Sequence, residues 1–418
     1  MSLAVPRLLY QLFIQEYGMD TNTDTTRPAG TADTVAMMQQ NVQRGIEHTP
    51  PDYFVQLLAL ADIKINGDRP WDIQIYNTNF YKRILRDGSI GLGESYMDGW
   101  WDCAQLDEMF AHILGAYLDE RVPGLAKLKL VFSAVAFKLF NFQSIKRAFH
   151  VGEAHYDIGN DLYRRMLDPR MIYSCGYWAQ ADNLADAQTH KLDLICRKLK
   201  LEPGMKLLDI GCGWGGLAAY AAENYGVEVT GVTISREQQK LACENVQGLP
   251  VEIILQDYRM LTGHYDRIVS VGMFEHVGVK NYRTFFNKVT QLLSDNGIFL
   301  LHTIGDEYTT KAPEPFIHKY IFPNGKVPSR KEITINSVDL LRLEDWHNFG
   351  PDYDKTLMAW AKNIDAAWDD LPEYDERFRR MWRYYLHACA GYFRSRQGQL
   401  WQLVFTQLND WSEYRSVR

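Results

Sequence analysis

The sequence predicts an α/β protein whose main domain is a doubly wound, largely parallel sheet, preceded by a smaller, mainly helical N-terminal domain. Three observations support this fold class. A buried strand at 206–210 runs directly into a glycine-dense turn and a short helix at 217–225. Further apolar runs at 227–232, 251–255, 266–271 and 297–302 are separated by helical segments, as in parallel sheets. Apolar positions between 51 and 147 recur at helical spacing instead.

The composition limits the function classes. A chain of 418 residues, 46% of them hydrophobic, can form two or three cores, and we divide it into segments 1–50, 51–150 and 151–418. The net charge of -7 argues against general nucleic-acid binding. Six cysteines without a C-x-x-C pair predict neither a metal site nor a disulfide scaffold, which indicates a reducing, cytoplasmic location. No apolar run reaches the ~18 residues that a membrane-spanning helix needs.

The first 50 residues form an extension that we expect to be partly disordered. Their start is apolar but lacks the basic region of a signal peptide. Residues 20–34 are rich in Thr and Asp, a composition typical of disorder.

The second segment contains two features of different kinds. Aromatic residues gather at 91–102, a pattern that more often forms a core than a binding surface. At 125–149, Lys and Arg alternate with apolar residues, and no acidic residue occurs between Glu120 and Glu153. Such a segment can lie on an anionic bilayer, and it can equally be a packed helix with a basic rim. The sequence leaves these two interpretations open.

The glycine turn organises the α/β domain. Gly211, Gly213 and Gly216 satisfy the G-x-G-x-x-G pattern, which alone is a weak indication of a dinucleotide. Asp209 favours another ligand, because a carboxylate repels a pyrophosphate but attracts an amino-acid ammonium. The second strand also ends without the Asp or Glu that binds a ribose in dinucleotide sites. We therefore predict S-adenosylmethionine as the cofactor.

Polar groups follow five successive strands of the predicted sheet. In doubly wound sheets the ligands bind at the carboxyl ends of the strands, so these groups should meet at one edge. They are Asp209 with Gly211, Thr233, Asp257 with Tyr258, Glu275, and His302.

Several of these groups also have purely structural explanations. Ser235 and Gln238 fit a helix-capping box as well as a cofactor contact. Asp257 can cap the following turn, although a carboxylate at this place suits the adenine amino group, which we favour. A lone His302 would usually be structural, but with Glu275 at the adjacent strand end it predicts a proton-handling site.

Motifs along most of the chain support a specific resemblance. In order they read LLDIGCGWGG, GVTISREQ, LQDYR, SVGMFEHVG, LHTIG, KYIFPNG and EDWHNFGPDY. From about residue 55 to 415 the chain resembles bacterial cyclopropane-fatty-acyl-phospholipid synthases, which convert the cis double bond of a phospholipid acyl chain to a cyclopropane. The resemblance implies a Rossmann-like S-adenosylmethionine methyltransferase domain, unsaturated phospholipids as substrates, peripheral contact with the inner face of the membrane, and a homodimer.

The resemblance also implies two sets of site residues. The cofactor would be held by Tyr173, Ser174, Asp209, Gly211, Gly213, Thr233, Gln238, Asp257 and Tyr258. A bicarbonate ion would be held by Cys175, Glu275, His302, the Ile304 backbone and Tyr353.

The chemistry explains the need for such groups. Methyl transfer to an alkene produces a carbocation, so water must be excluded, and aromatic faces can stabilise the cation. The candidates for these faces are six aromatic residues, namely Tyr173, Tyr177, Phe274, Tyr320, Phe322 and Trp346. A base must then remove a proton, and we expect bicarbonate to do so while Glu275 and His302 position it. A small-molecule methyltransferase and a non-catalytic lipid-binding protein remain the alternatives.

Overall fold

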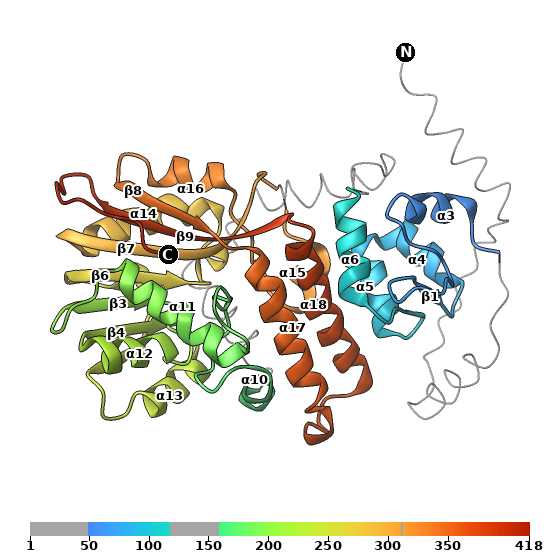
Figure 1. The fold of residues 1–418 in the computed structure, drawn as a ribbon, viewed down its shortest axis with the longest axis horizontal. Coiled ribbons are helices and arrows are strands. Elements are labelled where there is room, and N and C mark those ends of the chain that lie inside the picture. Colours follow the sequence, from blue (N-terminus) through green and yellow to red (C-terminus); the bar gives the residue numbers. More distant parts are fainter. Residues whose placement is uncertain (1–48, 118–158, 311) are drawn as a thin grey trace, which may run out of the picture.

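The computed structural model describes residues 49–117 and 159–418, apart from residue 311 (Figure 1). The predictions for the N-terminal extension up to residue 48 and for the basic segment 125–149 lie outside these residues.

A seven-stranded sheet forms the centre of the described α/β part, in the order β5-β4-β3-β6-β7-β9-β8. The strands from β5 to β7 are parallel, whereas β9 is antiparallel to both of its neighbours, β7 and β8. Their bounds are β3 (Lys206–Ile210), β4 (Glu228–Thr233), β5 (Val251–Leu255), β6 (Tyr265–Val271), β7 (Leu293–Asp306), β8 (Leu341–Asn348) and β9 (Gly398–Gln407). The doubly wound, largely parallel prediction is confirmed, and β8 and β9 are additions to it.

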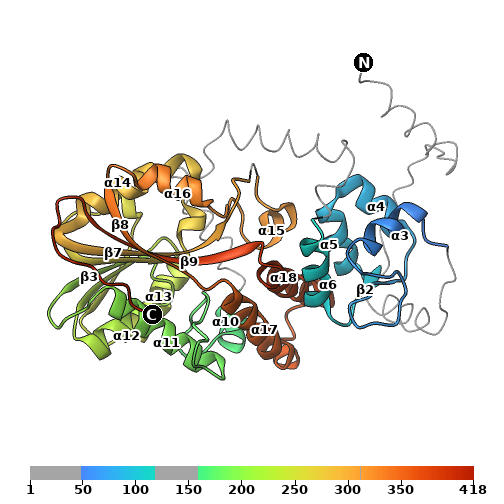
Figure 2. The same ribbon diagram turned by 45° about the horizontal axis from the view of Figure 1, so that its top comes forward.

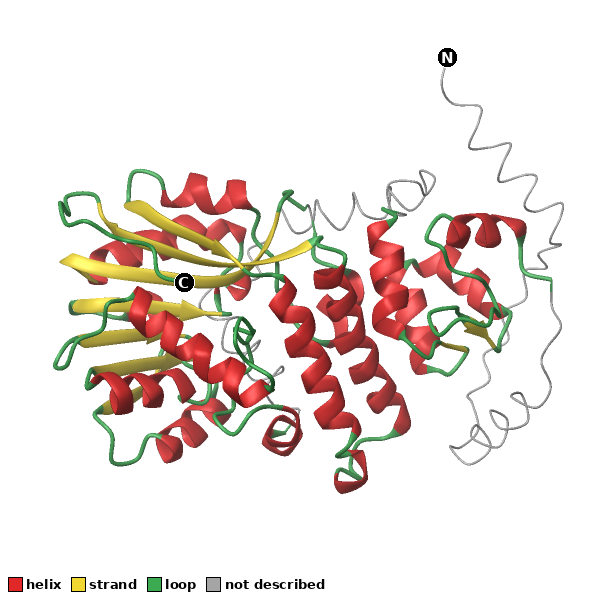
Figure 3. Cartoon of the chain, in the orientation of Figure 1, coloured by secondary structure: helices red, strands yellow, loops and turns green. Residues whose placement is uncertain are grey.

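Helices cover both faces of the sheet (Figure 3). One face carries α11 (Leu184–Lys198), α12 (Gly216–Tyr225) and α13 (Arg236–Asn245), and the other carries α14 (Tyr282–Leu292) and α16 (Arg330–Ser337). Successive side chains of a strand point to opposite faces, so both must be apolar. Leu207 accordingly packs in the core on the α11 side and Leu208 in the core on the α14 side.

Short helical turns and caps complete this domain. The four turns are η1 (Tyr258–Met260), η2 (Phe274–His276), η3 (Val279–Asn281) and η4 (Trp368–Asp370). Asn183 caps α11 by accepting from the backbone N–H of Asp186, so α11 begins at the next residue, Leu184.

The described part of the N-terminal segment is mainly helical, as predicted. It contains α3 (Asp52–Ala59), α4 (Asn79–Asp87), α5 (Ser89–Met97), α6 (Leu106–Gly115) and the two-residue strands β1 (Gln74–Ile75) and β2 (Trp101–Asp102). Tyr96 and Trp101 are fully buried, which confirms that the aromatic cluster at 91–102 is core.

Two long C-terminal helices, α17 (Pro351–Asp365) and α18 (Glu376–Arg394), lie between the sheet and helices α3–α6 (Figure 2). Helices α6 and α18 approach closely, because a Cβ on Gly391 would lie 2.5 Å from the Phe110 Cβ. Arg394 pairs with Asp107, Glu108 and Asp354, which joins α6 to α17 and α18. The short helices α10 (Asn160–Met166) and α15 (Pro315–Tyr320) pack beside them.

A single apolar cluster joins the N-terminal helices to α17 and α18, and the domain boundaries at 50 and 150 stay a prediction. Among the described residues, no helix combines the length and the apolar character needed to cross a bilayer.

Candidate active site

The carboxyl ends of the parallel strands form the candidate site. The strand order continues from β3 to β4 and β5 in one direction and to β6 and β7 in the other. Doubly wound sheets bind their ligands at such a switch point, here between β3 and β6.

The glycine turn after β3 leaves room for a ligand. Gly211 and Gly213 have φ values of 87° and 55°, which favour glycine. A Cβ on Gly211 would lie 2.7 Å from the Met273 side chain, whereas a Cβ on Gly213 would meet nothing within 4 Å. Helix α12 begins at Gly216, so its free N–H groups lie beside this open backbone.

Two buried titratable groups, Asp209 and Lys191, interact electrostatically close to the turn. Asp209 is 2% exposed, and burial raises its pKa to about 7 against the opposing effect of Lys191. Lys191 on α11 is also buried, and burial lowers its pKa to about 8. Its Nζ donates to the Ser174 Oγ over 3.0 Å. A cationic ligand group next to Asp209 would therefore favour the ionised form of this carboxyl.

The turn that contains Tyr173 and Ser174 is held on both sides. Gln188 on α11 donates to the Ser174 backbone oxygen over 2.8 Å. The Tyr173 hydroxyl lies 2.8 Å from that of Tyr385 on α18, and its ring packs against Trp360 on α17. The two predicted residues are thus placed next to the end of β6, where Ser174 approaches Gly272.

The contacts at the ends of β4 and β5 show which of the predicted capping roles are present. Ser235 caps α13 through the Gln238 backbone N–H, as a capping box requires. The Gln238 side chain does not complete the box, because its Oε1 accepts from the Thr233 hydroxyl over 2.8 Å. Thr233 and Gln238 thus form one polar unit at the end of β4.

Asp257 has the capping role that the sequence offered as its structural alternative. Its Oδ1 accepts from the Arg259 backbone N–H over 2.9 Å, and its carboxylate also pairs with the Arg259 guanidinium. The Tyr258 ring packs against Phe285 at 5.4 Å. An adenine contact by Asp257 and Tyr258 stays a prediction.

A second subsite lies at the end of β7. Cys175, Ile304 and Tyr353 belong to one small cluster with Phe349 and Leu400. Glu275 joins them, since its Oε1 accepts from the Ile304 N–H over 2.7 Å. The His302 ring lies 5.9 Å from the Phe349 ring. The structure therefore brings together all five residues that the resemblance implies for the bicarbonate ion. The Ile304 N–H, however, already donates its hydrogen bond to Glu275.

Two polar atoms of this subsite are unsatisfied. The Glu275 Oε2 and the His302 Nε2 are buried and have no hydrogen-bond partner among the described residues. Burial raises the pKa of Glu275 to about 7 and holds that of His302 well below its usual range. A neutral imidazole and a readily protonated carboxyl result, and both can bind an oxygen ligand.

Cys175 is positioned by α17. Its fully buried thiol donates to the Gly176 carbonyl over 3.1 Å, and burial raises its pKa well above the usual value. The Thr356 hydroxyl accepts from the Gly176 N–H and from the Trp178 indole, at 3.0 and 2.9 Å. The turn at 173–178 is thus tied to a helix that begins more than 170 residues later in the chain.

Three supporting residues escaped the sequence-based prediction, namely Lys191, Thr356 and Gln402. Lys191 had a signal, because Gln188, Lys191 and Lys198 recur at helical spacing on the buried face of α11. Thr356 and Gln402 had none, since only the tertiary fold places them against site residues.

The six candidate aromatic residues divide into three groups, of which Tyr320 forms one, because its hydroxyl donates to the Glu94 Oε1 over 2.8 Å and its ring packs against Phe316. Tyr173 packs against Phe322, and Tyr177 packs against Phe349 in the cluster of Cys175. Phe274 stacks on Tyr282 in the core on the α14 side, and Trp346 packs against that core. The prediction is therefore wrong for Phe274, which is fully buried in this core, and it stays a prediction for Trp346 and Tyr320.

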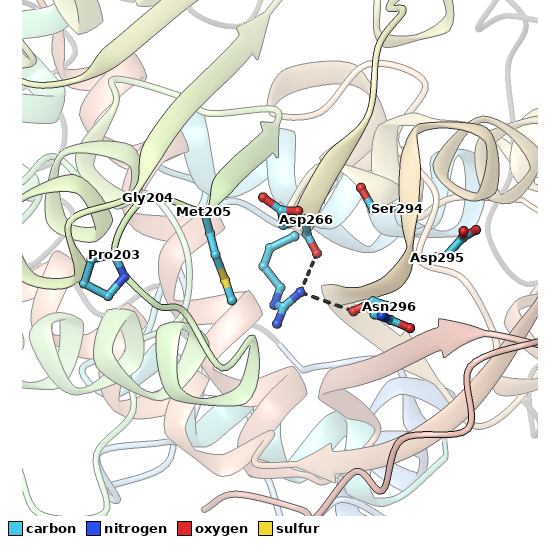
Figure 4. Close-up of a pocket in the computed structure, with 8 residues that line it drawn as sticks. Pro203, Gly204, Met205, Asp266, Ser294, Asp295 and Asn296 are labelled. Atoms are coloured by element: carbon cyan, nitrogen blue, oxygen red, sulfur yellow. Dashed lines mark hydrogen bonds between the residues drawn. The ribbon is translucent and has the colours of Figure 1, made fainter.

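An open hollow lies at the opposite edge of the sheet (Figure 4). It is formed at the amino ends of β3, β6 and β7 by Pro203, Gly204, Met205, Asp266, Arg267, Ser294, Asp295 and Asn296. None of the predicted site residues lines it.

Comparisons with known proteins identify the family of this chain. The family of mycolic acid cyclopropane synthetases matches residues 143–403. The chain is 58% identical over 353 residues to the cyclopropane-fatty-acyl-phospholipid synthase of Escherichia coli K12, covering 84% of this chain and 92% of the relative. It is 38% identical over 264 residues to a probable fatty acid methyltransferase of Pseudomonas putida, covering 60% and 67%.

Solved structures give the same result. The cyclopropane synthase MmaA2 from Mycobacterium tuberculosis matches with a TM-score of 0.59 and 31% identity, over 62% of this chain and 98% of that one. The mycolic acid cyclopropane synthase CmaA1, solved with SAH and CTAB, matches with a TM-score of 0.59 and 33% identity over the same shares.

Proposed function

Because the chain belongs to the mycolic acid cyclopropane synthetase family of S-adenosylmethionine-dependent enzymes, we propose that it converts cis double bonds of phospholipid acyl chains to cyclopropanes. The observation that carries the proposal is the pairing of two adjacent subsites. One is an open glycine turn above a buried carboxylate, and the other holds unsatisfied Glu275 and His302 atoms.

The first subsite fits S-adenosylmethionine. Asp209 would hold the ammonium, and the backbone at Gly211 and Gly213 can approach the ligand because no Cβ intervenes. Thr233 and Gln238, with Asp257 and Tyr258, would bind the nucleoside end at the next strand ends. The bound cofactor supplies an electrophilic methyl group.

The protein's own residues keep the reaction dry. Cys175 is fully buried, and its turn is tied to α17 through Thr356. Water would convert the carbocation to an alcohol, so this closure protects the intermediate. The faces of Tyr173 and Phe322 can each stabilise a cation by up to ~2 kcal/mol.

The second subsite fits a bicarbonate ion, which would supply the base for the final proton. The raised pKa of Glu275 removes an electrostatic conflict, because a protonated carboxyl can lie beside an anion and donate to it. Glu275 Oε2 and His302 Nε2 are two unsatisfied atoms that can hold the ion. Cys175 and Tyr353 would complete the subsite from the other side.

Peripheral membrane contact follows from the substrate. Moving a C16 chain through water would cost about 13 kcal/mol at ~0.8 kcal/mol per CH₂. The enzyme would therefore take the chain directly from the bilayer, at the inner face of the membrane. We propose that the basic segment 125–149 makes this contact and that the enzyme is a homodimer.

One experiment tests the proposed reaction. The protein is incubated with methyl-labelled S-adenosylmethionine and vesicles of unsaturated phospholipid, and the acyl chains are analysed for labelled cyclopropane. Label in the acyl chains is expected. Label only in small molecules would indicate a different methyltransferase, and vesicle binding without any transfer would indicate a non-catalytic lipid-binding protein.

A second experiment tests the membrane contact. Lys127, Lys129, Lys138, Lys146 and Arg147 are replaced together by Glu. Vesicle flotation should weaken by about 1 kcal/mol for each cation at the lipid surface, while cofactor binding is retained. Equal flotation of variant and wild type would contradict the role of this segment.

A further inference from the structure

We infer that Gln402 is a positioning residue that fixes the tautomer of His302, so that the His302 Nε2 carries the ring proton and donates it to an oxygen ligand. The inference deepens the proposed function and rests on it for the identity of that ligand.

The geometry begins with strand register. Strands β7 and β9 are antiparallel, and His302 and Gln402 are direct partners across them. Directly opposed residues carry their side chains on the same face of the sheet. Both residues are almost completely buried, and the Gln402 Nε2 lies 3.2 Å from the His302 Nδ1.

The Gln402 amide determines which ring nitrogen of His302 carries the hydrogen. In this orientation the Gln402 amide nitrogen faces the ring and can only donate, so the His302 Nδ1 accepts and carries no hydrogen. A neutral imidazole has one ring hydrogen, which then lies on Nε2. This atom is buried without a partner among the described residues, as is the Glu275 Oε2. The His302 Nε2–H can thus donate to an anion, and so can the Glu275 carboxyl when it is protonated.

A neutral partner suits this task better than a carboxylate. A Glu at 402 would accept from Nδ1–H, move the proton away from Nε2 and favour a charged imidazolium. The charged groups that act on His302 are Lys191 and Lys198 on α11, together with His347 on β8. Glu275 on η2, Cys175 and Tyr353 are the other titratable groups of the subsite. The two lysines oppose an imidazolium, and the amide of Gln402 leaves that balance unchanged.

Stability alone does not account for Gln402. Its Oε1 is buried and has no hydrogen-bond partner among the described residues. An unpaired buried carbonyl is destabilising, so an apolar side chain of equal size would suit the core better. Gln407 on the same strand provides the contrast, since its amide donates to the Thr290 and Leu293 carbonyls at 3.1 and 3.0 Å.

The test reads the tautomer directly. The full chain is labelled with ¹⁵N-histidine, and the His302 signals are assigned by comparison with His302→Asn. Wild type should show Nε2–H only. Gln402→Met should show a mixture of tautomers, and Gln402→Glu should show Nδ1–H together with protonation of the ring at higher pH.

Activity on phospholipid vesicles supplies the second readout. Gln402→Met and Gln402→Glu should each lower kcat by about tenfold to hundredfold, the range seen when metal-binding histidines lose the partner that orients them. Affinity for S-adenosylmethionine should not change, and the acid limb of the Gln402→Glu pH profile should move to higher pH. Gln407→Met is the control, with lower stability but an unchanged tautomer and pH profile.

Three outcomes separate the ideas. An Nδ1–H tautomer in wild type, or Gln402→Met with wild-type tautomer and kcat, overturns the inference. An Nε2–H tautomer that depends on Gln402 in a protein without cyclopropane synthesis supports the positioning role and overturns the proposed function.

Discussion

The two ends of the central sheet are built from the same strands but differ in how deeply their titratable side chains are buried. At the carboxyl end, Asp209, Glu275 and His302 are buried, and the pKa of each is displaced by burial. At the amino end, Asp266 is partly exposed and Asp295 is exposed beside the open hollow of Figure 4. The strands therefore carry polar groups at both ends, and burial shifts the pKa values of these groups at the carboxyl end.

The enclosure comes from outside the sheet. The turn at 173–178 is tied to α17 through Thr356 and closes the carboxyl end. At the amino end, Arg267 donates to the backbone oxygens of Leu199, Asp266 and Asn296, and no turn from the described part of the chain is tied across the hollow in this way. Buried titratable groups cost stability, so the carboxyl end is the part of the sheet where function opposes stability.

The largest expected difference concerns two glycines at the two ends. Gly211 and Gly204 both have positive φ, at 87° and 82°, but only a Cβ on Gly211 would meet a neighbour, Met273, at 2.7 Å. Gly211→Ala should abolish S-adenosylmethionine binding in calorimetry. Gly204→Ala should keep the affinity and lose only about 1–2 kcal/mol of stability through backbone strain. Equal affinities in both variants would refute the cofactor site.

The second difference concerns two carboxyl groups. Burial raises the pKa of Glu275 to about 7, whereas an unfolded chain loses this proton near 4.5. The native state should thus lose stability as the pH rises from about 4.5 to 7, and Glu275→Gln should remove this loss. At pH 8 the free energy of unfolding of Glu275→Gln should exceed that of wild type by roughly 3 kcal/mol, so the variant should unfold at a higher denaturant concentration. The variant should also lose most of its activity.

Asp295→Asn is the matched control for Glu275→Gln, because Asp295 is exposed at the amino end. Its stability should stay within about 0.5 kcal/mol of wild type at every pH. Denaturation of both variants at pH 5 and pH 8 measures the effect. A stability gap for Glu275→Gln that is the same at both pH values would contradict the buried, protonated carboxyl.

A third prediction concerns the cofactor's ammonium. Burial raises the pKa of Asp209 to about 7, and a cationic ligand gains only from the ionised form. Affinity for S-adenosylmethionine should therefore fall as the pH drops below 7, by up to about tenfold per unit. Asp209→Asn should bind weakly without this pH dependence, whereas Asp266→Asn should behave as wild type. Calorimetry between pH 5.5 and 8 measures the affinity of each variant for S-adenosylmethionine. A wild-type affinity that does not change with pH would exclude proton release from Asp209 on binding.

The smallest expected effect concerns the closure itself. Thr356→Val removes the acceptor for the Gly176 N–H and the Trp178 indole, so stability should fall by about 1–3 kcal/mol. Methylated, hydroxylated acyl products should also increase, because water can enter and add to the carbocation. Thr290→Val at the amino end loses one bond within α14 and should change stability by less than about 1 kcal/mol. Identical product ratios in the two variants would show that Thr356 does not keep the site dry.

The sequence by itself determined the elements that depend on local patterns. Apolar runs predicted the parallel strands to within a few residues of their observed bounds, and the glycine turn placed the cofactor site at the end of β3. Alternating apolar positions must face two covered layers, which made the doubly wound sheet the economical fold. The rule that ligands bind at carboxyl ends then selected Asp209, Glu275 and His302 without any structure.

Only the tertiary structure decided how those residues are protonated and held. Lys191, Thr356 and Gln402 act on site residues that lie 17 to 181 positions away in the chain. The state of Glu275 follows from its burial and its bond to the Ile304 N–H. Desolvation and hydrogen-bond partners are properties of the packed fold, because both depend on which atoms exclude water from a side chain. No local pattern carries that information, so the sequence identified the groups and the packing determined their chemistry.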